Sequence, residues 1–77
     1  MELIKYNRIA EVLIEKNKTQ KWLAEQLGVT EEAVSHWCKQ KSQPSFRNLY
    51  AAANKLGVDV RELLEPNENS PHKNFKF

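Results

Sequence analysis

The side chains best suited to chemistry lie on one face of a helix that the sequence predicts from Glu31 to about Gln40. At 100° per residue, the apolar members of this helix share one continuous arc, formed by Ala33, Val34, Trp37 and Cys38. The rest of the wheel is polar without interruption and holds Glu31, Glu32, Ser35, His36, Lys39 and Gln40. The helix therefore has one face for a core and one face of hydrogen-bond donors and acceptors to present.

The chain has almost no residues that could catalyse a reaction or bind a metal ion. Cys38 is the single cysteine, so no internal disulfide can form. The two histidines, His36 and His72, are far apart in sequence, and no CxxC or HxxxH spacing occurs. No Ser/His/Asp or Cys/His constellation or phosphate-cradling glycine loop is present, and the chain is too short to enclose a cleft. We expect no enzyme, no metal, no cofactor and no small-molecule ligand.

The composition describes one small, water-facing domain. The chain has 77 residues, 12 Lys and Arg against 10 Asp and Glu, and 40% hydrophobic residues. No stretch approaches the roughly 20 apolar residues that span a bilayer, and the charged start lacks the apolar run of a signal peptide. We expect a cytoplasmic protein away from membranes. Its net charge of +2 neither demands nor excludes nucleic acid, because one face can be basic in a nearly neutral domain.

The hydrophobic pattern predicts an all-α fold, a compact bundle of five short helices in residues 1–65. The first helix should start near residue 4 to 7 and fade by Asn17. The others should lie between Thr19 and Gly28, from Glu31 to about Gln40, between Ser45 and Gly57, and over a turn or two from Asp59 to Leu64. The apolar faces of the first and fourth helices should be Tyr6, Ile9, Val12 and Leu13, and Phe46, Leu49, Tyr50, Ala53 and Leu56.

The ends of these helices carry their own signals. Thr19, Thr30 and Ser45 are candidate N-caps, and Gly28 and Gly57 stand where left-handed C-terminal residues belong. Asp59 with Glu62 resembles a capping box. Past Pro66, residues 67–74 include no apolar member, so 66–77 should be a flexible tail. Its last aromatic residues, Phe75 and Phe77, either fray or dock on the domain or on a partner.

The second and third predicted helices form the most informative unit. A tight link, Leu27 to Thr30, joins them through Gly28, and Ala24 keeps them close, as in a helix-turn-helix of residues 19–40. From here the chain resembles the phage lambda repressor and Cro type of helix-turn-helix domain, also called the xenobiotic-response-element type. The matching residues, within Lys18–Leu64, are Thr19, Gln20, Leu23, Ala24, Leu27, Gly28, Val29, Thr30, Val34, Ser35, Trp37, Lys41, Pro44, Ser45, Leu49, Ala53, Leu56, Gly57, Val58, Leu63 and Leu64.

This resemblance implies a domain that binds operator-like double-stranded DNA, usually as a two-fold dimer. In the family the third helix reads base edges, the start of the second helix grips a phosphate, and the link after the third helix meets the DNA backbone. The positions that correspond in this chain are Gln20, Glu31, Glu32, Ser35, His36, Lys41, Ser42 and Gln43. Lys39 is a further candidate for contact with DNA.

Two features of the predicted recognition helix depart from the family pattern. Glu31 and Glu32 stand where the family often has basic or amide residues. They can accept a hydrogen bond from cytosine N4 and reject other bases, or they can simply complement the helix dipole. His36 stands where many members carry Arg or an amide, and it either reaches a base or phosphate or is a solvated surface residue.

Three further residues raise questions of packing. Cys38 sits where relatives often carry a glutamate paired to the first helix, here at Leu13, so an apolar contact can replace a buried ion pair. Cys38 is then a core residue, with a sensor thiol as the alternative. Trp37 should anchor its helix to the core, whereas Trp22 lies off the apolar stripe and either packs within the domain or contacts a protein.

Two classes of function remain. The first is a sequence-specific transcriptional regulator, a small repressor that binds a pseudo-palindromic operator as a homodimer, with recognition helices about 34 Å apart. The second is a protein-interaction module, such as an antitoxin-like or adaptor domain with weak DNA affinity. Basic residues that ring the third helix would favour the first class; they are Lys21, Lys39, Lys41 and Arg47. Candidate pairing residues are Val60, Leu63, Leu64, Phe75 and Phe77.

Overall fold

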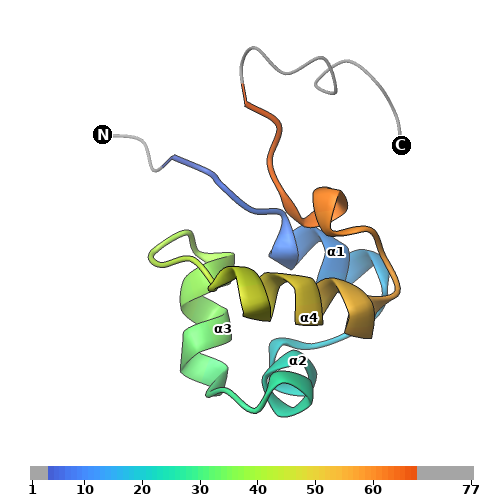
Figure 1. Cartoon of the computed structure of the whole chain (residues 1–77). Coiled ribbons are helices and arrows are strands. Elements are labelled where there is room, and N and C mark those ends of the chain that lie inside the picture. Colours follow the sequence, from blue (N-terminus) through green and yellow to red (C-terminus); the bar gives the residue numbers. More distant parts are fainter. Residues whose placement is uncertain (1–3, 68–77) are drawn as a thin grey trace.

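The structure is a computed structural model that describes residues 4–67 of the chain. It consists of four α-helices and a terminal 3-10 helix: α1 Ile9–Glu15, α2 Gln20–Leu27, α3 Glu31–Cys38, α4 Phe46–Leu56 and η1 Val60–Leu63. Figure 1 shows α4 lying across the molecule with α3 and α2 beneath it and α1 behind its upper side. Within residues 4–67 the sole β-type pairing is an isolated bridge, so the all-α prediction is confirmed.

The helices begin and end where the capping residues predicted. Thr19 accepts a hydrogen bond from the Trp22 amide at 3.0 Å, and Ser45 accepts one from the Asn48 amide at 3.1 Å. α4 ends at Gly57, whose φ of 72° lies in the left-handed region that glycine adopts without steric cost. Each of these bonds pairs a backbone donor that a helix end leaves without an intrahelical partner.

One hydrophobic core joins all five elements. Its buried members are Ile9, Val12, Leu13, Leu23, Ala24, Val34, Trp37, Leu49, Ala52, Ala53, Leu56 and Leu63. α2 packs against both α3 and α4, while η1 packs against α4 and α1. The start and end of the described chain are therefore held on the side of the bundle opposite α2, as Figure 1 shows.

The first helix begins later than predicted, at Ile9 rather than between residues 4 and 7. The preceding residues are extended because they pair in an antiparallel fashion with the chain after η1. The Arg8 amide donates to the Leu63 carbonyl at 2.8 Å, and the Glu65 amide donates to the Tyr6 carbonyl at 2.9 Å. Tyr6 consequently lies outside the helix and is exposed, so its predicted place on the core face was wrong.

The third helix ends earlier than predicted, at Cys38 rather than near Gln40. Gln40 has a φ of 64°, which a residue inside a right-handed helix cannot adopt. Its side chain instead binds the extended N-terminal segment, and that tertiary contact ends the helix.

The predicted core face of the fourth helix was too wide. Leu49, Ala53 and Leu56 are buried, but Phe46 and Tyr50 are exposed. Neither of these aromatic side chains is covered by another element of the described chain. The fifth helix is the single 3-10 turn η1, which starts with the expected Asp59 capping box.

Candidate nucleic-acid interface

The candidate interface is built on the packing of α2 against α3. The link between them turns at Gly28, which has a φ of 70°, and the Val29 amide closes α2 by donating to the Ala24 carbonyl at 3.1 Å. Thr30 then caps α3 by accepting from the Ala33 amide at 3.0 Å. Because Ala24 is buried between the helices, a larger side chain there would push them apart.

α3 presents the polar face that the sequence predicted. Val34 and Trp37 fix the opposite face in the core. Glu31 and Glu32 are exposed in the first turn, while Ser35 and His36 are half-buried on the outward side. The helix is therefore held by its apolar face, and its polar side chains lie on the side that a partner can approach.

Polar groups also gather at the start of α2. Gln20 is the first residue of this helix and is half-buried, and Lys21 beside it is exposed. The first backbone amides of a helix have no intrahelical acceptor, and the helix dipole adds a partial positive charge there. This end of α2 is therefore suited to an anion such as a phosphate.

The turn after α3 is held to the helix that precedes it. The Lys39 amide donates to the Ser35 carbonyl at 3.0 Å, and the Lys41 amide donates to the His36 carbonyl at 2.9 Å. The side chains of Lys39, Lys41 and Ser42 are exposed. These three predicted contact residues are thus presented from a backbone that hydrogen bonds hold in place.

Gln43 is engaged differently from the other predicted contact residues. Its Oε1 accepts from Asn7 Nδ2 at 2.7 Å, and its Nε2 donates to Gln40 Oε1 at 3.4 Å. Gln43 is therefore tied to the N-terminal segment, although its residue remains exposed. The side-chain amide of Gln43 is thus directed toward the protein itself.

The polar cluster of Asn7, Gln40 and Gln43 was missed by reasoning from the sequence. Asn7 is 2% exposed; its Nδ2 also donates to the Trp37 carbonyl at 3.0 Å, and its Oδ1 accepts from the Ile9 amide at 3.0 Å. Gln40 Oε1 accepts from the Tyr6 amide at 2.9 Å. No local signal could have revealed this cluster, because Asn7 lies more than thirty residues from Gln40 and Gln43 in the chain.

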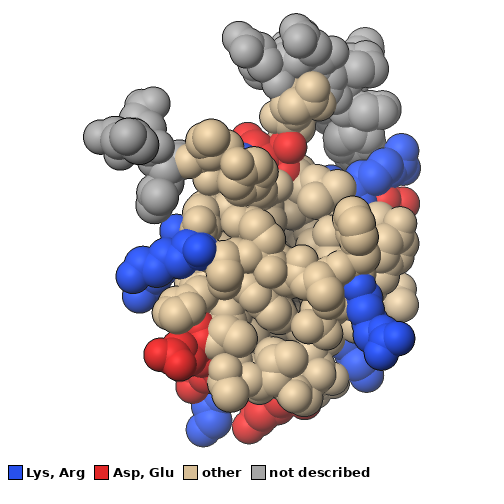
Figure 2. Space-filling model, turned by 60° about the vertical axis from the view of Figure 1, so that its left-hand side comes forward, with Lys and Arg blue, Asp and Glu red and all other residues tan. Residues whose placement is uncertain are grey.

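Basic side chains stand around α3 rather than on it. They are Lys21 at the start of α2, Lys39 and Lys41 after α3, and Arg47 in the first turn of α4, and all four are exposed. The ion pairs found within residues 4–67 involve other cations, namely Lys5, Arg8 and Arg61. Figure 2 shows the side of the molecule that carries α3 and the start of α4, with an uncharged centre and charged groups along its margins.

Two residues with open roles pack within the domain. Burial raises the pKa of the Cys38 thiol, and the Glu11 carboxylate raises it further. Cys38 is half-buried against the core, which supports its role as a small apolar residue. Trp22 also packs on the core, with Lys18 Nζ at 4.8 Å from the centre of its ring.

Metal-binding clusters and membrane-spanning helices are both missing from the described chain. Among residues 4–67, no group of three or more His, Cys, Asp or Glu side chains is placed to hold a metal ion. In the same range, every helix is too short or too polar to cross a bilayer.

Comparison with known proteins identifies the fold built from these parts. The sequence model of the helix-turn-helix family, of the lambda repressor and Cro type, matches residues 9–63. The chain belongs to this helix-turn-helix family. The match runs from the start of α1 to the end of η1, so it includes every element of the helix-turn-helix domain described above.

Several solved structures share this fold. A protein of Bacteroides fragilis described as DNA-binding is 51% identical, with a TM-score of 0.75 over 77% of this chain and 95% of that one. The HEPD of Streptomyces albus, solved with 2-hydroxyethylphosphonate and Fe(II), is 32% identical, with a TM-score of 0.69 over 77% of this chain. That match spans 13% of the HEPD chain. A transcriptional regulator of Listeria innocua shares the fold at 20% identity, with a TM-score of 0.64 over 83% of this chain and 66% of that one.

Among curated proteins, none matches the chain. The family match and the solved structures therefore agree on a helix-turn-helix fold, and the Bacteroides fragilis protein with this fold is described as DNA-binding. The resemblance to the HEPD concerns a small part of that enzyme.

Proposed function

We propose that the chain is a sequence-specific transcriptional regulator, a small repressor that inserts α3 into the major groove of an operator. It binds as a homodimer on a pseudo-palindromic site, through a DNA-binding domain of residues 1–65 followed by a tail of residues 66–77. The proposal includes a cytoplasmic location, where a free cysteine such as Cys38 stays reduced.

The observation that carries this proposal is the placement of charge around α3. The four exposed basic residues Lys21, Lys39, Lys41 and Arg47 come from the start of α2, the end of α3 and the start of α4. The outward face of α3 lies among these elements and is polar. A DNA duplex that places its groove over α3 brings its phosphates to the basic rim.

Within this interface, α3 supplies the contacts that read bases. Glu32, Ser35 and His36 share its outward side, and Glu31 lies at the exposed first turn. A carboxylate accepts a hydrogen bond from cytosine N4 but repels the phosphate backbone, so Glu32 selects sequence at the cost of non-specific affinity. We therefore expect a regulator whose specific binding greatly exceeds its non-specific binding.

Contacts to the DNA backbone come from outside α3. Gln20 and the first amides of α2 bind one phosphate, and Lys39, Lys41 and Ser42 meet the backbone beyond the end of α3. Gln43 holds the turn through its bond to Asn7. Its side-chain amide has one hydrogen left, and we expect that hydrogen to reach the DNA backbone. These residues position the helix and do not select sequence.

The proposal is tested by selection from a random duplex pool with purified protein at near-physiological salt. We expect an enriched inverted repeat. Lys41→Ala should weaken binding to all sequences alike and lower the salt slope by about one, whereas Glu32→Ala should change the preferred base. Lys55→Ala, at the exposed end of α4, is the matched control and should change neither. Retention without any enriched sequence would refute sequence-specific regulation.

The second candidate function is a protein-interaction module with weak DNA affinity. The adjacent carboxylates of Glu31 and Glu32 at the tip of α3 favour it, because they repel phosphates. In the same selection this function predicts that no duplex is retained at all. A partner protein whose binding is lost on Glu31→Lys would then support it.

A further inference from the structure

The turn after α3, residues 39–42, closes its helix in a way that usually takes a glycine. The Lys41 amide donates to the His36 carbonyl at 2.9 Å. The Gln40 amide donates to the Trp37 carbonyl at 3.1 Å. This pair of bonds commonly ends a helix, and it needs a left-handed residue at the position of Gln40. Gln40 has a φ of 64°, which strains any residue that carries a Cβ, so other contacts must hold it there.

Those contacts come from the side-chain amide of Gln40, which pairs with the backbone of the N-terminal segment, residues 4–8. Gln40 Oε1 accepts from the Tyr6 amide at 2.9 Å and from the Asn7 amide at 3.3 Å. Gln40 Nε2 donates to the Asn7 carbonyl at 3.0 Å and to Asn7 Oδ1 at 3.3 Å. One side chain thus binds both backbone groups of Asn7, as a neighbouring β-strand does.

The opposite edge of the N-terminal segment is paired with the chain after η1. Asn7 faces Leu64 in an isolated antiparallel bridge, whose two hydrogen bonds are formed by the residues on either side. This pairing leaves the amide and the carbonyl of Asn7 for the other edge. Because Gln40 fills that edge, the N-terminal segment connects the turn after α3 to the end of the domain.

The chain around η1 gives this connection a fixed anchor. Leu63 is fully buried and Val60 is half-buried against the core. These two residues hold η1 in place, so they are not free for the pairing of two copies that the sequence suggested. Of the other candidates for pairing, Leu64 is exposed, and Phe75 and Phe77 lie outside the described residues.

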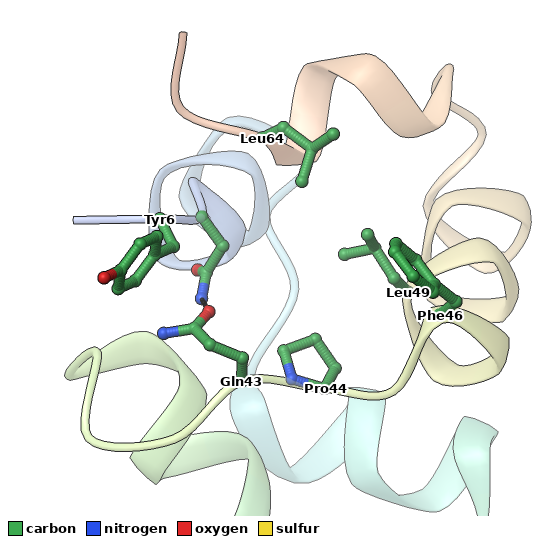
Figure 3. A pocket seen from close by; sticks show the side chains of 7 residues that line it. Tyr6, Gln43, Pro44, Phe46, Leu49 and Leu64 are labelled. Atoms are coloured by element: carbon green, nitrogen blue, oxygen red, sulfur yellow. Dashed lines mark hydrogen bonds between the residues drawn. The ribbon is translucent and has the colours of Figure 1, made fainter. Parts of the chain in front are cut away.

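A second amide makes the same connection. Gln43 Oε1 accepts from Asn7 Nδ2 at 2.7 Å. Figure 3 shows the Gln43 side chain pointing toward the N-terminal segment that carries Tyr6, while Pro44 leads on toward α4. The chain between α3 and α4 is therefore tied to residues 6 and 7 at two points, Gln40 and Gln43.

We propose that Gln40 is a positioning residue for DNA binding. The inference rests on the proposed function, in which the exposed side chains of Lys39, Lys41 and Ser42 meet the DNA backbone. Gln40 lies among these residues in the chain, but it is half-buried and its amide binds the N-terminal segment. It acts through the turn: when the turn is held in one place, its contacts with phosphates form without first ordering the backbone.

The chain contains a matched control for this role. α1 ends in the same pattern, in which the Lys18 amide donates to the Leu13 carbonyl at 2.8 Å and Asn17 has a φ of 61°. Within residues 4–67 the Asn17 side chain forms no hydrogen bond. Glycine at either position relieves the left-handed strain, but only Gln40→Gly also removes a contact between distant segments.

Amide hydrogen exchange tests this contact without DNA. In Gln40→Gly the Tyr6 and Asn7 amides lose their acceptor, so we expect them to exchange about tenfold faster. The Arg8 amide is bonded on the opposite edge and should keep its rate, which would exclude a general loosening of the fold. Asn17→Gly should leave all three rates unchanged. Thermal unfolding checks that both variants are folded at the temperature of the assays.

Binding to the selected inverted repeat then tests the role on DNA. Gln40→Gly should bind about tenfold more weakly than the natural chain, because ordering one residue of a loosened turn costs about that factor. Its salt slope should stay unchanged, since no charge is lost, in contrast to Lys41→Ala. The double variant should lose less affinity than the product of the two single losses, because both changes remove the same contact. Asn17→Gly should bind as the natural chain does.

Natural affinity in Gln40→Gly would overturn the inference, and so would losses that multiply in the double variant, because Gln40 would then contact DNA independently of Lys41. Unchanged exchange at Tyr6 and Asn7 would overturn it as well. If these results occur while the natural chain binds DNA, the proposed function stands without this role for Gln40. If the natural chain binds no duplex, the proposed function fails and the role on DNA fails with it, while the exchange rates still decide whether Gln40 holds the turn.

Discussion

The buried amide of Asn7 should contribute more to stability than any other polar side chain of the domain. Asn7→Ala would leave the Ile9 amide buried without a partner, and the Trp37 carbonyl would lose one of its two hydrogen bonds and keep the one from the Gln40 amide. The orphaned Ile9 amide costs about 1–3 kcal/mol, and the lost bond to the Trp37 carbonyl costs about 1 kcal/mol more. Gln40 and Gln43 lose bonds as well, but these residues are near the surface and can turn to water. We therefore expect a loss of roughly 3 kcal/mol, against a total stability of roughly 4–12 kcal/mol for a chain of this length.

Urea unfolding followed by tryptophan fluorescence measures this loss, because the side chain of Trp37 is buried in the folded core and becomes exposed on unfolding. The midpoint of thermal unfolding should fall by roughly 12–24 °C, at about 4–8 °C for each kcal/mol in a domain of this size. Asn54→Ala, on the exposed side of α4, is the matched control and should stay within about 0.5 kcal/mol of the natural chain. A loss below about 1 kcal/mol for Asn7→Ala would refute the reasoning, because it would mean that the orphaned Ile9 amide regains a partner.

Three further predictions concern the helix ends and the thiol. Gly28→Ala should cost about 1–2 kcal/mol from its positive φ alone, since an added Cβ meets nothing within 4 Å; a urea-measured loss above about 3 kcal/mol would contradict this. Thr30→Ala should cost about 1 kcal/mol in the same assay through loss of its bond to the Ala33 amide, and no change would contradict the cap. Because burial raises the pKa of Cys38 in the folded state, the stability it contributes is present below the unfolded pKa and is lost as pH rises through the folded one. Urea titrations from pH 7 to 11 should therefore show a steeper decline for the natural chain than for Cys38→Ala, and parallel curves would contradict the shift.

Local signals in the sequence predicted most of the helix boundaries. Ser45 and Gly57 bound α4 because a cap needs a side-chain oxygen at one end and a positive φ at the other, and both depend on a few neighbouring residues. The core face of α3 was predicted in the same way, since Val34 and Trp37 recur at helical spacing. The polar outward face followed from the remaining positions of that wheel.

Boundaries decided by distant contacts were not predictable from such signals. Residues 4–8 continue a helical pattern, yet the pairing of Arg8 with Leu63 holds them extended. The hydrogen bonds of Gln40 to the N-terminal segment likewise end α3. Hydrophobic periodicity also could not distinguish a buried aromatic residue from an exposed one, because Phe46 lies on the helical stripe but nothing in the described chain covers it.

The sequence by itself determined the class of fold, the helix-turn-helix unit and the polar face of α3, since caps, glycine turns and helical periodicity act over a few residues. The tertiary structure alone decided which apolar residues remain exposed, how Asn7 locks the turn after α3, and where the basic side chains stand around the recognition helix. Those features depend on contacts between segments far apart in the chain. Such contacts form only when the whole core has been assembled.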